Sequence, residues 1–420
     1  MLDHLELGLI HQKLINKPIL DLTSIIKGEL DLLNLNKVIK PKDTIAITVG
    51  SRGINNLDKI IKEVIQYFKF LKAKPFIFPA MGSHGGATVR GQLKILQDYG
   101  VNEESMGVPI IATMEVEELT KTRDGLSVYV DKSTLRADHI VVVNRIKPHT
   151  KWKGPIESGL CKMMAIGMGK HKGAQYYHKF ALKYGFSELI ESVASKVIEK
   201  LPILFGLAIV EDGYDQTSII KALIPDNLIK SEKILLEIAK DYLPRISFND
   251  IDILIVDEIG KEISGGGMDF NVIGRNRDIM NRWYSAQKIK RIFVRDITEN
   301  SRGNGLGIGM ADFTTDRLVE KLDLEKMYIN ALTASGPESA AIPIHFSNDK
   351  EAIMACLNTI GPINPSELKV VWIKNTLSLE NVYVSKALYT EAKKRSELDL
   401  IEDPKPIAFN KKNNLLSPFS

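Results

Sequence analysis

Short apolar runs alternate with longer segments whose apolar residues recur at helical spacing, and this alternation sets the expected organisation of the chain. The runs Asp43–Gly50, Lys74–Ala80 and Ala137–Asn144 are brief and almost continuously apolar, which predicts buried strands. Leu57–Leu71 and Ala87–Tyr99 repeat apolar residues three and four positions apart, which predicts helices. Strands that alternate with helices of this length predict parallel βαβ units.

The same pattern restarts after the segment Leu243–Asn249, which contains a proline and is the best candidate for a linker. Asp250–Asp257, Arg291–Asp296 and Leu368–Ile373 predict three further strands. Glycine-rich loops follow the first two of these strands, as they do in the first half of the chain. The fold class expected is therefore α/β, with two α/β domains whose sheets are mostly parallel and with a cleft between them.

The length of 420 residues also favours two hydrophobic cores rather than one. We place an N-terminal domain at residues 1–245, a C-terminal α/β domain that closes the cleft at residues 250–402, and a loosely packed tail at residues 403–420. Residues 1–42 are expected to lay an edge strand against the first domain.

The composition of the chain is that of an ordinary globular protein of a reducing compartment. Hydrophobic residues make up 44% of the chain and the net charge is only +4, which is ordinary for a globular protein and gives no reason to expect nucleic-acid or membrane partners. Cys161 and Cys356 are too few for a disulfide framework and are expected to be small buried hydrophobes in a reducing compartment. No signal-peptide core opens the chain, and the run Ile203–Val210 is far short of the ~20 residues of a membrane span, so a cytoplasmic location is predicted.

The segment directly after the third predicted strand is rich in histidine and lysine side chains, which can take part in catalysis or ligand binding. The stretch from Asn144 to His178 holds His149 and His171 as well, and glycines separate its lysines. The turn at His149 follows a strand, and open α/β sheets bind ligands at the carboxyl ends of their strands. Imidazoles and lysines among glycines suit an anionic ligand, with or without a metal ion beside it. A solvated basic loop explains the same composition.

Two other glycine loops follow predicted strands, at Gly50–Gly53 and Gly82–Gly86. Neither is a P-loop or a dinucleotide fingerprint, and both can be purely structural turns, although backbone N–H groups at a helix start also suit anions. These loops carry Arg52 and His84. If the strands are neighbours, Arg52 can hold a carboxylate through two parallel hydrogen bonds, while His84 and His149 can each move a proton. No role is assigned to the remaining histidines, His4, His11, His139 and His345.

As a set these residues resemble the nickel-pincer-nucleotide racemases and epimerases, the lactate racemase-like family. The resemblance covers most of the chain and is strongest at Arg52, at Gly82–His84 and across His149–His178, where Lys162 precedes His178 by sixteen residues. The loops Ser264–Asp269 and Gly303–Gly305 are similar to those of an uncharacterised branch rather than to those of lactate racemases themselves.

The resemblance implies a cofactor and the residues that hold it. The cofactor is nickel in a pincer nucleotide, a pyridinium-3-thioamide-5-thiocarboxylic acid mononucleotide, which cofactor-maturation proteins make. Lys162 is implied to join one arm of the cofactor and His178 to ligate nickel, with His171 as a rival for the metal. Imidazole and soft sulfur both suit nickel. His84 and His149 are implied to be the acid–base pair.

The reaction implied is inversion at C2 of a small 2-hydroxy acid by proton-coupled hydride transfer, in the domain at residues 1–245. Arg52 is implied to bind the substrate carboxylate, and Arg275 and Arg277 lie near the place of the family's second-domain substrate lysine. Val49 stands where lactate racemase has an aspartate, and Trp152 replaces a small residue, which leaves the identity of the 2-hydroxy acid open.

Three other classes of protein fit parts of the pattern. A metal-independent enzyme can form a Schiff base on Lys162. A redox enzyme can use a diffusible nicotinamide cofactor, although the missing fingerprint counts against it. A non-catalytic binder of a phosphorylated ligand fits the glycine loops and the lysines.

Overall fold

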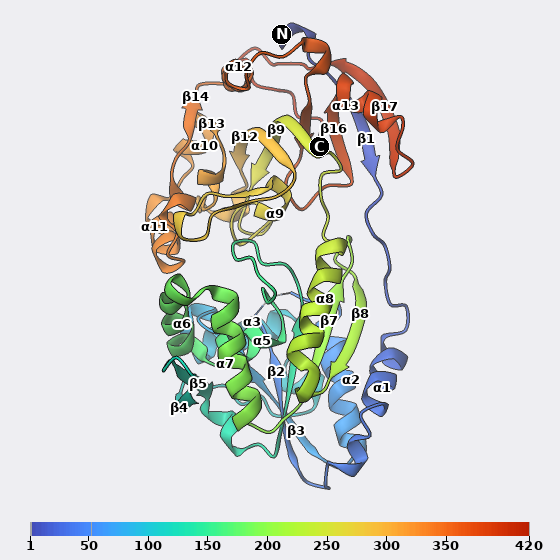
Figure 1. Ribbon diagram of the computed structural model, residues 1–420, viewed down its shortest axis with the longest axis vertical. Helices are drawn as coiled ribbons and strands as arrows, with labels where there is room; N and C mark the ends of the chain where they lie inside the picture. The colour runs from blue at the N-terminus through green and yellow to red at the C-terminus, as the bar shows by residue number, and fades with distance from the viewer. Residues whose placement is uncertain (1, 52, 420) are drawn as a thin grey trace. The chain divides into compact units, whose positions relative to one another are not determined.

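The computed structural model describes residues 2–51 and 53–419, and the chain divides into two compact units (Figure 1). Unit 1 joins residues 1–14 to residues 244–420, and unit 2 consists of residues 15–243. Each unit is an α/β structure around a mostly parallel sheet, which confirms the predicted α/β class with mostly parallel sheets. Within the described ranges, no helix is both long enough and apolar enough to cross a membrane.

The sheet of unit 2 has five strands in the order β3-β2-β6-β7-β8. The first four are parallel and β8 is antiparallel to β7. From β2 the chain moves to one side for β3 and later to the other side for β6, so the strand order reverses beside β2. The strands are β2 (Thr44–Val49), β3 (Lys74–Pro79), β6 (His139–Arg145), β7 (Ile203–Glu211) and β8 (Thr217–Leu223).

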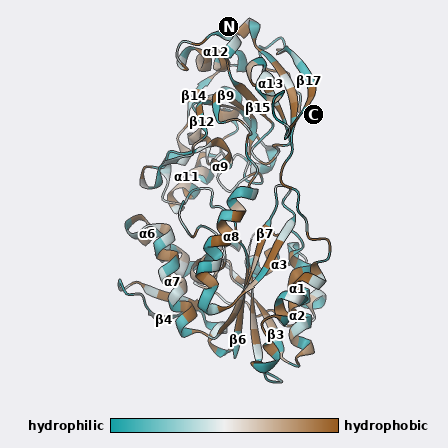
Figure 2. Cartoon of the chain, turned by 45° about the vertical axis from the view of Figure 1, so that its right-hand side comes forward, coloured by the Kyte–Doolittle hydropathy of each residue, from teal (hydrophilic) through white to brown (hydrophobic). Residues whose placement is uncertain are grey.

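Helices cover both faces of this sheet and enclose a separate core on each (Figure 1). In α2 the apolar residues at helical spacing, such as Ile61 and Phe68, are fully buried against the sheet. Figure 2 shows the strands between the two layers largely in brown, as expected for strands buried on both faces. One layer contains α1 (Leu22–Asp31), α2 (Leu57–Phe70), α3 (Val89–Asp98) and α4 (Glu103–Met106). The other contains α5 (Leu160–Lys162), the π-helical turn η5 (Met163–Gly167), α6 (Lys170–Tyr184), α7 (Phe186–Lys200), α8 (Leu228–Tyr242) and the hairpin β4 (Val116–Lys121) with β5 (Ser127–Asp131).

The sheet of unit 1 has eight strands in the order β14-β13-β12-β9-β15-β16-β1-β17. Its parallel half consists of β9 (Asp250–Ile259), β12 (Lys288–Ile297), β13 (Phe313–Thr315), β14 (Ile344–Phe346) and β15 (Val370–Ile373). Its antiparallel half consists of β16 (Asn381–Ser385), β1 (Glu6–Gln12) and β17 (Leu398–Pro406). The other elements are α9 (Phe270–Ile273), α10 (Asp316–Glu320), α11 (Leu324–Thr333), α12 (Asp349–Thr359), α13 (Lys386–Ala392) and the ribbon β10 (Arg275–Asn276) with β11 (Trp283–Tyr284).

The two ends of the chain differ from the sequence-based expectation. β1 pairs with β16 and β17 inside the sheet of unit 1, so residues 1–14 are not an edge of the N-terminal domain and the expected range 1–245 is wrong at its start. The expected loose tail at residues 403–420 is also wrong, because β17 continues to Pro406 and Leu415 is buried. Both errors concern pairings between distant segments, which local apolar patterns do not encode.

Candidate active site in unit 2

The loops after β2, β3 and β6 meet the start of α5 at the carboxyl edge of the unit 2 sheet, where the strand order reverses. Gly50 follows β2, and a Cβ atom there would lie 2.9 Å from the Cε atom of Met163 and 3.9 Å from the Oδ1 atom of Asn144. The loop after β2 therefore lies directly against the segment that follows α5. Asn144, near the end of β6, donates a 2.8 Å hydrogen bond to the carbonyl of Gly159 at the start of α5. Arg52 lies outside the described residues.

His84 is exposed and lies in the loop after β3, at the N-cap of the short turn Gly85–Ala87. Its Nδ1 atom is 3.0 Å from the carbonyl oxygen of Met81 and 2.5 Å from Oγ of Ser51. A carbonyl oxygen can only accept, so the hydrogen bond to Met81 assigns the proton to Nδ1 and leaves the lone pair on Nε2. In this tautomer Nε2 is a base.

A buried ion pair supports the loop that carries His84. Lys170 is fully buried at the start of α6, and its ammonium is 2.9 Å from a carboxylate oxygen of Asp131 and 3.3 Å from Oε1 of Gln92. Gln92 donates in turn to the carbonyl of Gly82 at 3.2 Å. Burial lowers the pKa of Lys170, and Asp131 opposes that shift. The backbone of Lys170 is in the left-handed region, with φ 52°, a conformation that is costly for a residue other than glycine.

His149 is held by the backbone that follows it. Its Nδ1 atom accepts hydrogen bonds from the backbone N–H groups of Lys151 at 3.0 Å and of Trp152 at 3.1 Å. Because Nδ1 accepts, the neutral ring carries its proton on Nε2, the opposite tautomer to that of His84. The backbone N–H of His149 donates to the carboxylate of Glu157 at 2.7 Å, and Glu157 is buried with Lys240 3.3 Å away.

Three of the predicted site residues gather around the ring of Phe186, the first residue of α7. The ring centroids of His149 and His178 are 5.6 and 6.4 Å from that of Phe186. The Nζ atom of Lys162 is 5.6 Å from the same centroid, and Trp152 stacks on the ring at 5.0 Å. Lys162 also approaches Oγ of Ser158, at 3.3 Å. The structure thus brings together His149, Lys162 and His178 on one aromatic platform.

His178 lies on α6 with its ring fixed by a 2.7 Å hydrogen bond from Nδ1 to the carbonyl of Ala174, which leaves the Nε2 lone pair available. Burial lowers the pKa of His178, and the positive charges of Lys162 and Lys151 lower it further, against the opposing effect of the Ala174 bond. A neutral imidazole is the form that binds metal ions.

His171, the rival for the metal, lies two turns before His178 on the same helix face. Its Nδ1 atom is buried and has no hydrogen-bond partner among the described residues. Ala174, between the two histidines, lies against the loop of His84, because a Cβ atom on Gly82 would be 3.5 Å from the Ala174 Cβ. Both histidines therefore belong to the helix face that packs on that loop.

The residues present fit a group that brings its own donor atoms. Throughout the described ranges, no three His, Cys, Asp or Glu side chains are arranged to hold a metal ion. One neutral imidazole beside a lysine fits a group that brings most of its own donor atoms.

Arg275 and Arg277 belong to unit 1, where both bind Asp312. The guanidinium of Arg275 is 2.9 Å from the Asp312 carboxylate, donates to the carbonyl of Ile289, and is buried, which lowers its pKa. Arg277 pairs with the other carboxylate oxygen and donates to Ala311 at 2.9 Å, but a third of its side chain is exposed. Of the two, only Arg277 offers a substrate a substantial exposed surface.

Sequence reasoning missed the residues that shape this site. Phe186, Glu157 and Lys170 are each buried, and their roles depend on contacts across 8 to 91 positions of sequence. Gly185 is the local sequence feature that could have indicated the position of Phe186. Its φ of 84° permits the tight link between α6 and α7, and Phe186 is the first residue of α7.

Comparison with known proteins shows the fold. No protein-family model matches the chain, and no curated protein matches it. Among solved structures, the lactate racemase apoprotein from Thermoanaerobacterium thermosaccharolyticum aligns with a TM-score of 0.53 and 14% identity, over 88% of this chain and 94% of that one. A protein from Thermotoga maritima aligns with a TM-score of 0.51 and 11% identity, over 87% and 99%. At such identities the likeness establishes a lactate racemase-like fold alone.

Proposed function

We propose that this protein is an isomerase that inverts C2 of a small 2-hydroxy acid and uses a nickel–pincer nucleotide. The observation that carries the proposal is the cluster of His149, Lys162 and His178 around Phe186, at the carboxyl edge of a parallel sheet. The fold likeness to lactate racemase agrees with it but does not determine an activity.

Lys162 and His178 would hold the cofactor. The Lys162 ammonium lies over the ring of Phe186 and near the hydroxyl of Ser158, and its side chain is half-buried. His178 presents Nε2 as a neutral donor because its Nδ1 atom is engaged by Ala174. When bound, the nickel–pincer nucleotide would supply the hydride-transfer chemistry at C2 of the substrate. His171 is the alternative metal ligand because its Nδ1 atom has no described partner.

His84 and His149 would move the hydroxyl proton. In the neutral tautomers that these hydrogen bonds favour, His84 would present an unprotonated Nε2 that can take a proton, and His149 would present a protonated Nε2 that can donate a hydrogen bond to a substrate oxygen. Arg52, which the structure does not describe, would bind the substrate carboxylate in the two-pronged manner that arginine favours. Within unit 1, Arg277 is more accessible than Arg275.

The test uses protein purified from its native host. We expect one nickel per chain and a peptide in which Lys162 carries the added mass of the nucleotide. In Lys162→Ala the adduct should be lost, whereas Lys172→Ala, ten residues later and over the ring of Tyr129, should retain it. His178→Ala should lose nickel while its melting curve stays that of the wild type, and His171→Ala should keep nickel. The reverse result would assign the metal to His171.

Activity is measured by chiral chromatography of a panel of 2-hydroxy acids. The holoprotein should racemise or epimerise at least one of them, and His84→Ala or His149→Ala should each lower the rate by ~10²- to 10⁴-fold. Active protein without nickel, or with unmodified Lys162, would contradict the cofactor part of the proposal and favour a metal-independent enzyme. Inversion of none of the acids by nickel-loaded, modified protein would contradict the substrate class.

A further inference from the structure

A cavity lies at the carboxyl edge of the unit 1 sheet, away from the residues discussed so far. β9 pairs in parallel with β12 on one side and with β15 on the other, so the strand order reverses at β9. Open α/β sheets bind ligands at such positions. The cavity has a volume of ≈ 380 Å³ and is lined by the ends of β9 and β12, by Lys374 after β15, by α10 with Lys321, and by Ser417 and Phe419. Its size is that of a small-molecule site.

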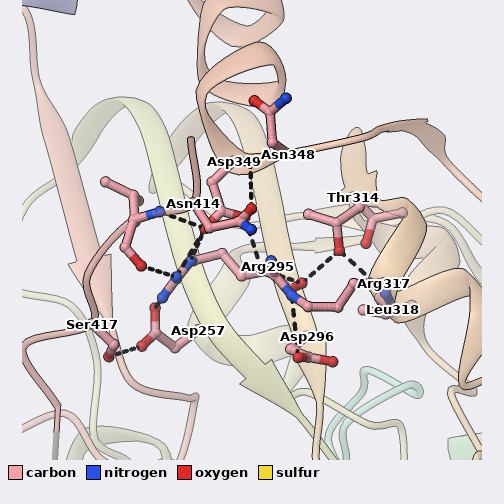
Figure 3. A network of polar contacts seen from close by, with 12 residues as sticks. Asp257, Arg295, Asp296, Thr314, Arg317, Leu318, Asn348, Asp349, Asn414 and Ser417 are labelled. Atoms are coloured by element: carbon pink, nitrogen blue, oxygen red, sulfur yellow. Dashed lines mark hydrogen bonds and ion pairs between the residues drawn. The ribbon is translucent and has the colours of Figure 1, made fainter. Parts of the chain in front are cut away.

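Most charges in the wall are already neutralised by one another, as Figure 3 shows around Arg295. Arg295 is buried and its guanidinium lies 2.5 Å from Asp257 and 2.8 Å from Asp349. Arg317 lies 2.8 Å from Asp349 and 3.2 Å from Asp296. These shared carboxylates fix the wall in one arrangement.

Two side chains of opposite charge in the cavity lining, Glu258 and Lys374, are not neutralised by an ion pair with another described residue. Glu258, near the end of β9, accepts a 3.0 Å hydrogen bond from the neutral amide of Asn375. Lys374 is half-buried, and in the described part of the chain neither it nor Glu258 forms an ion pair. The two residues are neighbours on adjacent strands, because the backbone N–H of Glu258 donates to the carbonyl of Lys374 at 3.1 Å. A partly buried charge without a partner is costly, and a ligand of opposite charge relieves that cost.

We propose that this cavity binds a small zwitterion, namely a free α-amino acid. The ligand's ammonium group would pair with Glu258 and its carboxylate with Lys374. Among the described residues the lining holds four carboxylates and four cationic side chains, so a ligand without net charge is favoured over a simple anion or cation. Phe419, packed on Trp372 at 5.9 Å and on Tyr383 at 5.5 Å, gives an apolar surface for the ligand's side chain. This site is independent of the activity proposed for unit 2.

The test begins with calorimetric titration of the full chain with each of the twenty free L-amino acids. For the tightest binder, the matched carboxylate without the amino group and the matched amine without the carboxylate are titrated next. Each analogue should bind at least tenfold more weakly than the amino acid, which is about 1.4 kcal/mol. Binding should also change the fluorescence of Trp372, which stands behind Phe419.

Matched variants locate the binding. Glu258→Gln and Lys374→Met should each weaken amino-acid binding at least tenfold, whereas Glu367→Gln and Lys411→Met, which replace exposed residues of the same unit, should leave it unchanged. Glu258→Gln should not weaken the carboxylate analogue, which lacks the group that Glu258 binds. Melting curves identify any variant that unfolds. If Glu258→Gln unfolds, Glu258→Asp is tested in its place; it keeps the negative charge and should retain amino-acid binding. The proposal is overturned if no amino acid binds, if an analogue binds as tightly as the amino acid, or if both pocket variants bind like the wild type.

Discussion

At the scale of single residues, the candidate site in unit 2 depends on side chains that are fully buried. Lys170 is buried beneath the loop of His84 and is joined to it through Gln92. Its ammonium and the carboxylate of Asp131 are both completely buried. Such a pair contributes little net stability by itself, but each partner prevents the other from being an isolated buried charge. The position of His84 therefore rests on the integrity of a pair that the sequence alone gave no reason to notice.

We predict that Lys170→Met lowers the free energy of unfolding by about 3–5 kcal/mol, because it leaves Asp131 buried without its cation. The double variant Lys170→Met/Asp131→Asn should recover part of that loss. Urea unfolding measures both. The control is Lys132→Met, whose side chain is half exposed and pairs with Glu115 at 2.9 Å, and which should change stability by less than ~1 kcal/mol. Equal effects of Lys170→Met and Lys132→Met would contradict the assigned role.

At the scale of elements, α5 begins against a buried acid from α8. Glu232 accepts a 2.9 Å hydrogen bond from the backbone N–H of Cys161, and its other carboxylate oxygen has no partner in the described structure. A Cβ atom on Gly159 would come within 2.4 Å of that oxygen, so the glycine is required for the approach. Burial raises the pKa of Glu232 to about 7. Burial and the nearby Glu232 also raise the pKa of the Cys161 thiol well above its usual value, which agrees with an unreactive cysteine.

This raised pKa predicts a dependence of stability on pH. The folded protein binds the Glu232 proton more tightly than the unfolded chain, in which the pKa of this carboxyl is near 4.5. The contribution of this protonation to the free energy of unfolding is therefore complete below pH 4.5 and is lost as the pH rises to about 7. Above pH 7 the carboxylate costs up to about 3 kcal/mol. Glu232→Gln should remove this slope and be more stable than the wild type at pH 8.

Chemical unfolding at half-unit steps between pH 4 and pH 8.5 measures the effect of Glu232. Glu237→Gln is the control, because Glu237 lies on the same helix with 68% of its side chain exposed and should leave the slope unchanged. A slope that persists in Glu232→Gln would mean that another group titrates in this window.

The elements also show where sequence patterns suffice. The predicted strand Lys74–Ala80 and helix Leu57–Leu71 agree with β3 and α2 to within one residue at each end, because a buried face repeats with the period of the element. The π-helical turn after Lys162 was not predicted, since its altered hydrogen bonding leaves the local apolar pattern unchanged. For the site, the sequence predicted the stretch from His149 to His178 but not the ring of Phe186, because that contact depends on how α7 packs.

At the scale of the whole molecule, the chain crosses between its two units twice, near residues 14 and 243. Unit 2 is one continuous segment with a core on each face of its sheet. Unit 1 is discontinuous, because β1 lies between β16 and β17 and contributes Leu7 and the fully buried Ile10 to its two cores. Removal of β1 would expose this apolar surface and leave two strand edges unpaired.

We therefore predict that residues 15–243 fold alone, whereas residues 244–420 do not. Loss of β1 removes the strand that joins β17 to the rest of the sheet, and the apolar burial lost is comparable with the whole stability of a typical domain, about 5–15 kcal/mol. The matched control is a fusion in which residues 1–14 are joined to residue 244 by a short glycine–serine linker. The join is feasible because Gln12 contacts the backbone at both Arg245 and Ser247, at 3.4 and 2.7 Å. Circular dichroism and amide NMR spectra should show folded protein for the 15–243 fragment and the fusion, and a disordered or aggregated chain for 244–420. A well-folded 244–420 fragment would contradict the prediction. It would show that β1 packs on unit 1 but is not needed for unit 1 to fold.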